Sequence, residues 1–272
     1  MSNLIVRQIP FEFDGVDFIW NPRNPEFALF ANILSFQTIG FERFIGKSMR
    51  SVRDRVTDPE LLAELIDFDA QEMTHSKAHF AHVRSMVKEY PTLQTVFDTC
   101  IADFDRKWRA SSLEYRLAYS AIIEASSLPL YRIVIQHRAK LLEGGDPRVA
   151  ALLLWHFCEE IEHRSSALRV YNHVVGKPFL RLRLFPDVGR HLAENLRRIA
   201  SGIVEHVPQA RGLDLRRAMT GIPRWAKLKM IVSLFTSQSP FYDPAKGSLP
   251  AYCDIWARRY AGGEDMRVTP IN

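Results

Sequence analysis

Apolar residues recur every three or four positions along most of this chain, which is the period of an amphipathic helix. Stripes of this kind predict five helices ahead of residue 176, over residues 25–55, 59–89, 92–107, 112–144 and 146–175. Asp58 followed by Pro59 is typical of a helix start, with an acidic N-cap before a proline in the first turn. Pro129 falls inside the fourth stripe, where it removes one backbone hydrogen bond and is expected to bend the helix.

The pattern changes after residues 176–178, where the sequence Gly-Lys-Pro ends the last of these stripes. Basic amphipathic helices are predicted over residues 179–207 and 214–236, and a short last helix over 249–260. Prolines punctuate the first 24 residues, which are expected to be extended. The sequence therefore predicts an all-α protein with an extended N-terminal arm, a four-helix bundle and a basic helical cap packed on the bundle, over residues 1–24, 25–176 and 177–272.

Two Glu-x-x-His pairs lie on the apolar stripes of the long helices. They are Glu72-Met-Thr-His75 and Glu160-Ile-Glu-His163. Residues three apart on a helix lie on the same side, so each carboxylate and its imidazole can point into one pocket and hold one metal ion. The alternative is that these are surface glutamates with histidines nearby.

A lone glutamate precedes each pair on the long helix before it, Glu42 in the first case and Glu124 in the second. Four glutamates and two histidines on four helices form the ligand set of a dinuclear carboxylate site. Buried carboxylates are costly unless they are paired or bound to metal. Two divalent ions would balance the four negative charges, which favours the metal interpretation independently of the spacing.

Further polar residues lie on or beside the same stripes. His156 is one turn before Glu160, where it can be a seventh ligand or a core histidine bonded to a carboxylate. His79 is one turn after His75 and faces the site, and we place it behind the ligands or in the pocket rather than on the metal. Glu159 lies off the stripe, so we expect it in solvent or behind a ligand.

Two other side chains are assigned plainer roles. Tyr131 is two turns beyond Glu124, where it can donate a hydrogen bond in a substrate pocket, although a core tyrosine is the simpler interpretation. His82 is treated as an ordinary polar position.

Length, composition and cysteine content limit the type of protein and its location. A chain of 272 residues with 47% hydrophobic residues can bury a large core. Three cysteines without a C-x-x-C pair argue against a disulfide framework and suit a reducing compartment. The N-terminus lacks the pattern of a signal peptide, and no run of 18 uncharged apolar residues predicts a membrane span. The expected location is the cytoplasm.

The positive charge is concentrated in one segment. Residues 177–231 carry 12 Lys or Arg and only four acids. Such a segment can face acidic substrates or a membrane surface, but a solvated cap face is the simpler interpretation, and peripheral membrane contact is not favoured. Nucleic acid is not expected as a partner, because no reading motif accompanies the charge.

With these residues in place, the chain resembles known families. The arrangement Glu42, Glu72-x-x-His75, Glu124, Glu160-x-x-His163 resembles the ferritin-like superfamily of dinuclear carboxylate proteins. The blocks at 41–44, 71–75 and 159–164 resemble, over most of the chain, the bacterial family labelled predicted metal-dependent hydrolases. His156-x-x-x-Glu160-x-x-His163 is similar to the histidine-rich unit of the p-aminobenzoate N-oxygenase group of di-iron enzymes. The long segment after 177 and the additional His79 depart from that group.

These resemblances imply a ferritin-like bundle and an enzyme that uses two iron ions and O2. We expect an oxygenase that performs N-oxygenation or hydroxylation of a small aromatic or acyl substrate, with an external electron donor. Hydrolysis at a dinuclear site is the first alternative, with Mn/Fe or Zn as other metals. A non-catalytic protein that binds or stores metal is the second. A homodimer is compatible with either, and the sequence identifies neither the substrate nor the metal.

Overall fold

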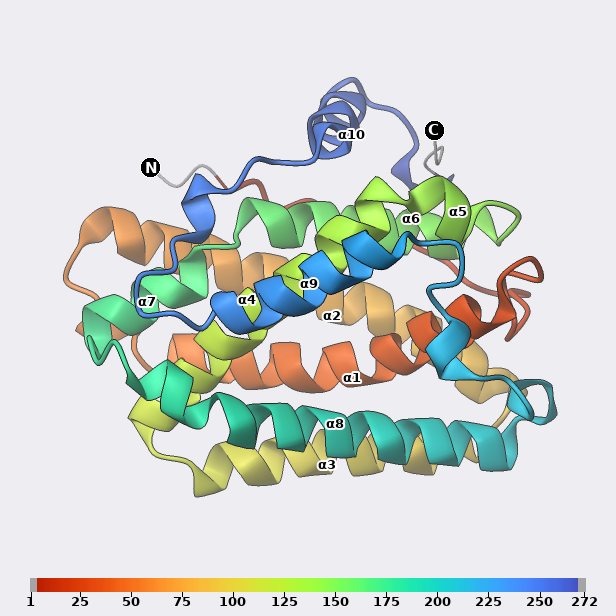
Figure 1. Cartoon of the computed structure of the whole chain (residues 1–272), viewed down its shortest axis with the longest axis horizontal. Coiled ribbons are helices and arrows are strands. Elements are labelled where there is room, and N and C mark those ends of the chain that lie inside the picture. Colours follow the sequence, from red (N-terminus) through yellow and green to blue (C-terminus); the bar gives the residue numbers. More distant parts are fainter. Residues whose placement is uncertain (1–3, 269–272) are drawn as a thin grey trace.

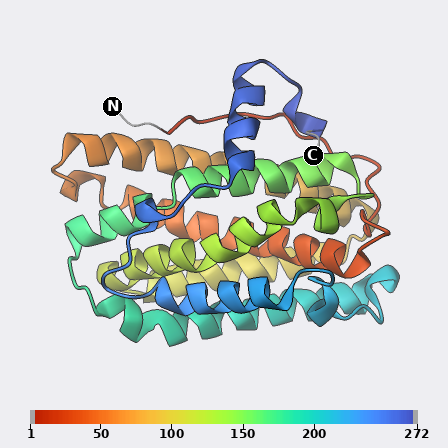
Figure 2. The ribbon, with the colours of Figure 1, turned by 45° about the horizontal axis from the view of Figure 1, so that its top comes forward.

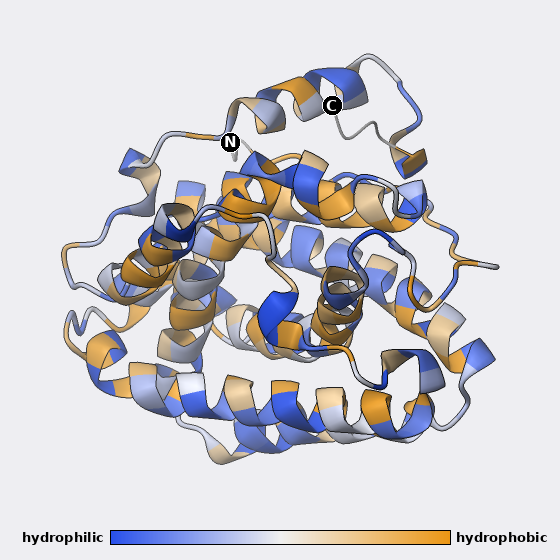
Figure 3. Cartoon of the chain, turned by 45° about the vertical axis from the view of Figure 1, so that its right-hand side comes forward, coloured by the Kyte–Doolittle hydropathy of each residue, from blue (hydrophilic) through white to orange (hydrophobic). Residues whose placement is uncertain are grey.

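The computed structural model describes residues 4–268, which form a bundle of helices (Figure 1) without any strand in that range. The prediction of an all-α fold is therefore confirmed. The helices are α1 (Pro25–Arg50), α2 (Pro59–Glu89), α3 (Leu93–Ala110), α4 (Leu113–Gln136), α5 (Arg138–Leu142), α6 (Pro147–Glu162), α7 (Ser166–Val174), α8 (Leu180–His206), α9 (Arg224–Thr236) and α10 (Ala251–Ala261). Hydrophilic and hydrophobic segments alternate along the helices, as amphipathic packing requires (Figure 3).

Helix α1 is the central element of the bundle. It packs against α2, α3 and α4, and α4 in turn packs against α6 and α7. Apolar side chains surround α1 on several faces, among them the buried Phe36, Phe44 and Ile45. A helix that is apolar nearly all round is buried rather than placed at the surface. This burial also takes Glu42, in the middle of α1, out of water.

Helix starts lie where the sequence signals place them. The Asn24 side chain accepts from the Phe27 N–H, and Asp58 accepts from the Glu60 and Leu61 N–H groups. Ser112 and Asp146 act in the same way at the starts of α4 and α6. These caps satisfy backbone donors that have no partner inside the helix. The predicted starts of the four long helices are confirmed.

Helix ends are predicted less well. Helix α1 ends at Arg50 rather than at residue 55, and the expected helix over 112–144 is interrupted at His137. The expected helix over 146–175 breaks at His163, which is the C-cap of α6. Arg164 accommodates that break, because its guanidinium donates to the carbonyl oxygens of Ile161 and Pro244. Glu160 therefore lies in the last turn of α6 and not in mid-helix as expected.

The chain after residue 176 packs on several sides of these helices. Figures 1 and 2 both place α8 along α3 and α9 along α4, and the two helices contact those neighbours. Helix α9 begins at Arg224, after Pro223, rather than at residue 214, and its outer face leaves Trp225, Leu228 and Phe235 exposed. Among the described residues, no helix is long and apolar enough to cross a membrane. The division into arm, bundle and cap stays a prediction.

Candidate metal centre

The helices bring all seven predicted ligands to one place in the interior. Glu42 comes from α1, Glu72 and His75 come from α2, and Glu124 comes from α4. His156 and Glu160 lie in the C-terminal half of α6, and His163 is the C-cap of that helix. Each of the seven side chains is at most 4% exposed, a set that comprises Glu42, Glu72, His75, Glu124, His156, Glu160 and His163. The structure shows that the seven side chains converge, and metal binding by each of them stays a prediction.

One group of four side chains, here called position A, consists of Glu42, His75, His156 and Glu160. One ligand atom from each lies within 4.8 Å of the others. Glu160 Oε1 is 3.0 Å from His156 Nε2 and 3.5 Å from His75 Nδ1. Glu42 Oε1 is 3.4 Å from His156 Nε2. Two carboxylates and two imidazoles thus face a common point.

A second group, position B, consists of Glu72, His75, Glu160 and His163. His163 Nε2 is 3.3 Å from Glu72 Oε1 and 3.5 Å from Glu160 Oε1. Glu124 lies outside this group of four, yet its Oε2 is 3.3 Å from His163 Nδ1. Glu160 and His75 belong to both groups, so they lie between the two adjacent candidate metal positions.

Several of the ligand atoms have no hydrogen-bond partner. They are both carboxylate oxygens of Glu42, both of Glu72, Nδ1 of His75 and both ring nitrogens of His163. Buried polar atoms are nearly always paired, because an unpaired one loses its hydration without compensation. Carboxylate and imidazole are donors that iron, manganese and zinc accept. The residues therefore fit a pair of metal ions, and the donor set does not choose among these metals.

The electrostatics of the cluster point the same way. Burial, and then the charge of Glu72, raise the pKa of Glu42 well above its usual value. Burial and the charge of Glu160 raise the pKa of Glu124 to about 8. Burial would also raise the pKa of Glu160, but the imidazoles of His163 and His156 outweigh it and hold that pKa well below its usual value. Positive charge within the cluster thus decides which carboxylates ionise, and metal ions supply such charge.

A buried ion pair lies behind His75. Glu159 is fully buried, and its Oε2 accepts a hydrogen bond of 2.9 Å from His75 Nε2. Arg7 Nη1 donates to Glu159 Oε1 at 2.9 Å and also pairs with Glu162. The proton on Nε2 leaves the Nδ1 lone pair of His75 free for position A or B, an arrangement typical of metal-bound histidines. Glu159 is thus not in solvent, and lies behind a candidate ligand instead.

A chain of hydrogen bonds lies behind His156. Its Nδ1 is 2.8 Å from His79 Nε2, and His79 Nδ1 is 3.0 Å from Ser35 Oγ. Ser35 Oγ also lies 3.0 Å from His82 Nδ1 and 3.2 Å from the Ala31 carbonyl oxygen. When Ser35 donates to Ala31, each imidazole donates its Nδ1 proton outward, and His156 Nε2 keeps a lone pair for a metal. A metal ion at position A would select this direction.

These hydrogen bonds and the burial of the side chains decide how His79, His82 and Tyr131 are placed. Both ring nitrogens of His79 are engaged, one with His156 and one with Ser35, so neither faces the metal points. His82 is only 1% exposed, so the expectation of an ordinary polar position is wrong. Tyr131 stacks on Phe157 with ring centroids 4.6 Å apart and is buried.

Sequence reasoning missed Arg7 and Ser35. Arg7 is a single cation between apolar residues of the N-terminal segment, and that isolation is a signal of a buried partner. Ser35 lies on the same stripe as Glu42, two turns earlier, which is a weaker signal because serine is common on helices.

A groove leads from the surface to the cluster. It encloses about 740 Å³ between α1, α2 and α3, and both Glu42 and Glu72 lie on its wall. Its apolar lining includes Phe80, Phe97 and Ile101. Phe80 is 41% exposed although it is a large apolar residue. A groove open to solvent therefore borders two of the candidate ligands, whose carboxylate oxygens are themselves buried.

Comparison with known proteins places the chain in a family. The family described as "Predicted metal-dependent hydrolase" matches residues 5–247, which include Arg7 and every candidate ligand. No curated protein and no solved structure matches the chain. The ferritin-like relation therefore rests on the ligand pattern and stays a prediction. The match covers most of the chain, and the protein belongs to the family of predicted metal-dependent hydrolases.

Proposed function

We propose that this protein is a hydrolase with a dinuclear metal centre, and that its substrate carries an apolar acyl or aromatic group. The observation that supports this most is the groove whose wall includes Glu42 and Glu72, because it brings a space open to solvent up to two of the candidate ligands. A divalent metal pair supplies Lewis acidity and lowers the pKa of water toward neutrality. The family membership supports the same reaction class.

The chain's own residues would bind and orient the substrate. Phe80, Phe97 and Ile101 offer an apolar wall that holds an acyl or aryl group and excludes water from it. Glu42 and Glu72 would fix the metals at the inner end of the groove. The sequence contains no G-x-S-x-G or H-E-x-x-H motif, so no separate nucleophile motif competes with a metal-based mechanism.

Ester hydrolysis by metal-loaded protein tests this function. Aryl esters of a short and of a medium-length fatty acid should both be cleaved, with loss of activity on chelation and full activity without O2. Phe80→Ala should raise KM for the longer ester about tenfold and leave the shorter one nearly unchanged, because only the longer chain uses the apolar wall. Leu249→Ala, an exposed apolar residue outside the groove, is the control. Absence of metal-dependent cleavage for esters and amides alike would refute the proposal.

One observation favours a second candidate function. His156 directs Nε2 at both Glu42 and Glu160, which gives the cluster a third imidazole and the donor count of the N-oxygenase group that the sequence resembles. In that case the protein would be a di-iron oxygenase acting on a small aromatic or acyl substrate with an external electron donor. Consumption of O2 by the Fe(II)-loaded protein with a reductant, without any ester or amide cleavage, would favour this function over hydrolysis.

A further inference from the structure

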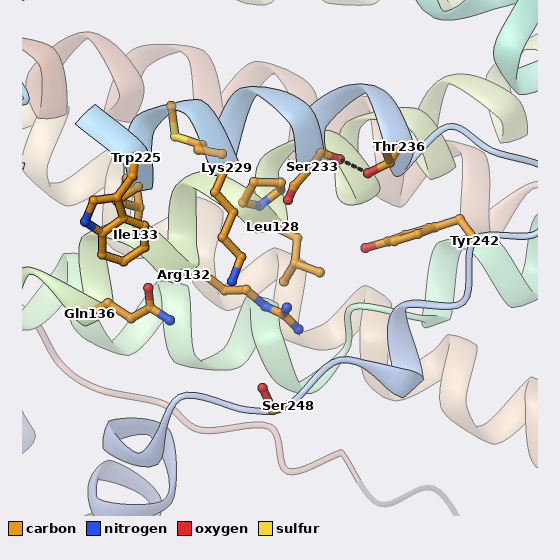
Figure 4. A pocket seen from close by; sticks show the side chains of 13 residues that line it. Leu128, Arg132, Ile133, Gln136, Trp225, Lys229, Ser233, Thr236, Tyr242 and Ser248 are labelled. Atoms are coloured by element: carbon orange, nitrogen blue, oxygen red, sulfur yellow. Dashed lines mark hydrogen bonds between the residues drawn. The ribbon is translucent and has the colours of Figure 1, made fainter. Parts of the chain in front are cut away.

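A second cavity lies between α4 and α9, and none of the candidate ligands lines it. It encloses about 460 Å³ (Figure 4). Its apolar lining includes Leu128, Ile133 and the indole of Trp225, which is 67% exposed. Polar groups reach the same space from α4, α9 and the segment that follows α9, and they include Gln136, Ser233, Tyr242 and Ser248. Most small-molecule sites fall in this range of volume and mix these residue types.

Two cations extend into this cavity from opposite helices. Figure 4 shows Lys229 reaching down from α9 and Arg132 reaching in from α4, with their charged ends directed at the same space. Neither has a carboxylate partner among residues 4–268. Arg132 Nε is buried and has no hydrogen-bond partner. A buried guanidinium nitrogen without an acceptor is unfavourable unless a ligand pairs with it.

The other charged residues near the cavity are engaged elsewhere. Asp243, next to Tyr242 in the chain, pairs with Lys246 at 3.6 Å and caps the Ala245 N–H. The guanidinium of Arg164 donates to backbone carbonyl oxygens rather than to a carboxylate.

We propose that this cavity binds a small molecule with an oxyanion head, a carboxylate or a phosphate, on an aromatic or short apolar body. The head would lie between Arg132 and Lys229, where a planar guanidinium can donate two parallel hydrogen bonds and an ammonium adds a point charge. The body would lie against Trp225, Leu128 and Ile133. This ligand site is separate from the metal centre and does not depend on the proposed hydrolysis.

Calorimetric titration of the full chain tests the site with four probes of similar shape. Benzoate and phenyl phosphate carry the head, benzyl alcohol is neutral and benzylamine is cationic. At least one anion should bind, and benzyl alcohol and benzylamine should bind more weakly or not at all. The tighter of the two anions then identifies the head as carboxylate or phosphate.

Variants assign the binding to this cavity. Arg132→Gln and Lys229→Gln should each weaken anion binding about tenfold or more, because each removes a charged hydrogen bond. Arg224→Gln removes the same charge from the exposed start of α9, outside the cavity, and should have no effect. Lys229 is exposed, so its variant is expected to fold normally. Anions that bind no better than benzyl alcohol, or that bind both cavity variants as tightly as the wild type, would overturn the proposal.

Discussion

The two metal positions differ in what lies behind their imidazoles. At position A, the ion pair Glu159–Arg7 supports His75, and the pair His79–Ser35 supports His156. His163, the imidazole that belongs to position B alone, is the C-cap of α6, and its nitrogens contact only carboxylates of the cluster itself, Glu124 at Nδ1 and Glu72 and Glu160 at Nε2. Hydrogen bonds from outside the cluster thus orient both imidazoles of position A, whereas the imidazole specific to position B lies at the end of a helix.

This contrast teaches how one cluster can hold two unequal metals. Outer hydrogen bonds fix the tautomer and direction of a ligand, and their loss costs a metal site 10–100-fold in affinity as a rough range. Position A has such support for both of its imidazoles. Position B shares His75 and Glu160 and is completed by Glu72 and His163, with Glu124 next to Nδ1 of the His163 ring. We expect position A to bind the tighter ion and position B the one that exchanges more readily.

The largest effect should follow from loss of the shared carboxylate. Glu160 Oε1 lies 3.5 Å from a nitrogen of both His75 and His163, so Glu160→Ala should reduce metal content at both positions. Elemental analysis after metal loading measures this. Glu143→Ala, which removes an exposed glutamate, is the matched control. Retention of both metals in Glu160→Ala would contradict the assignment of a bridging role.

Loss of Glu124 should affect one position only. Glu124→Ala removes the carboxylate that contacts His163 Nδ1, and no other acid lies on that turn of α4. The protein should keep the metal at position A and lose the one at position B, which titration with a chromogenic chelator can resolve. If two ions remain as tightly bound as in the wild type, Glu124 is not a ligand.

Loss of the cation behind His75 should weaken position A without emptying it. Arg7→Gln leaves Glu159 buried without its main partner, so the acceptor that orients His75 is no longer fixed. We expect the affinity of the tighter metal to fall about 10–100-fold. Arg23→Gln, at an exposed arginine of the same N-terminal segment, should leave it unchanged. A metal affinity equal to that of the wild type would remove the basis for the comparison.

His82, at the far end of the hydrogen-bond chain that begins at His156, should affect the pH dependence of stability. Burial lowers the pKa of His82 from 6.5 to about 4. Below its unfolded pKa the unfolded chain binds a proton that the folded protein does not, so the unfolding free energy falls as pH falls. Titration of His82 should lower the free energy of unfolding by about 2 kcal/mol from pH 7 to pH 5. His82→Gln should show a shallower slope in denaturant titrations at several pH values, and parallel slopes would refute the assignment.

The smallest effect is expected from Ser35. Ser35→Ala removes the acceptor of the His79 Nδ1–H and should weaken metal binding at position A about tenfold. Ser48→Ala is a close control, because Ser48 Oγ also donates to the carbonyl four residues earlier and lies 3.2 Å from a ring nitrogen, that of Trp108. Equal metal affinities in the two variants would show that Ser35 acts only in packing.

Local signals in the sequence predicted the starts of the long helices and the convergence of the seven candidate ligands. Asp58 and Pro59 act through their own backbone, and Glu72 and His75 are brought together by the period of a single helix. The break at His163 was missed because no glycine or proline marks it. The ion pair of Arg7 was missed because its partner is 152 residues away. Contacts between distant segments depend on how the helices pack, and single-sequence patterns do not carry that information.

The central claim is a dinuclear centre, and the metal content of the purified, metal-loaded protein tests it most directly. Inductively coupled plasma mass spectrometry on the wild type and on Glu160→Ala gives the number and identity of bound ions per chain. We expect two bound ions per chain in the wild type and a loss of both in the variant. One ion or none in the wild type, or equal metal contents in wild type and variant, would rule out a dinuclear centre bridged by Glu160.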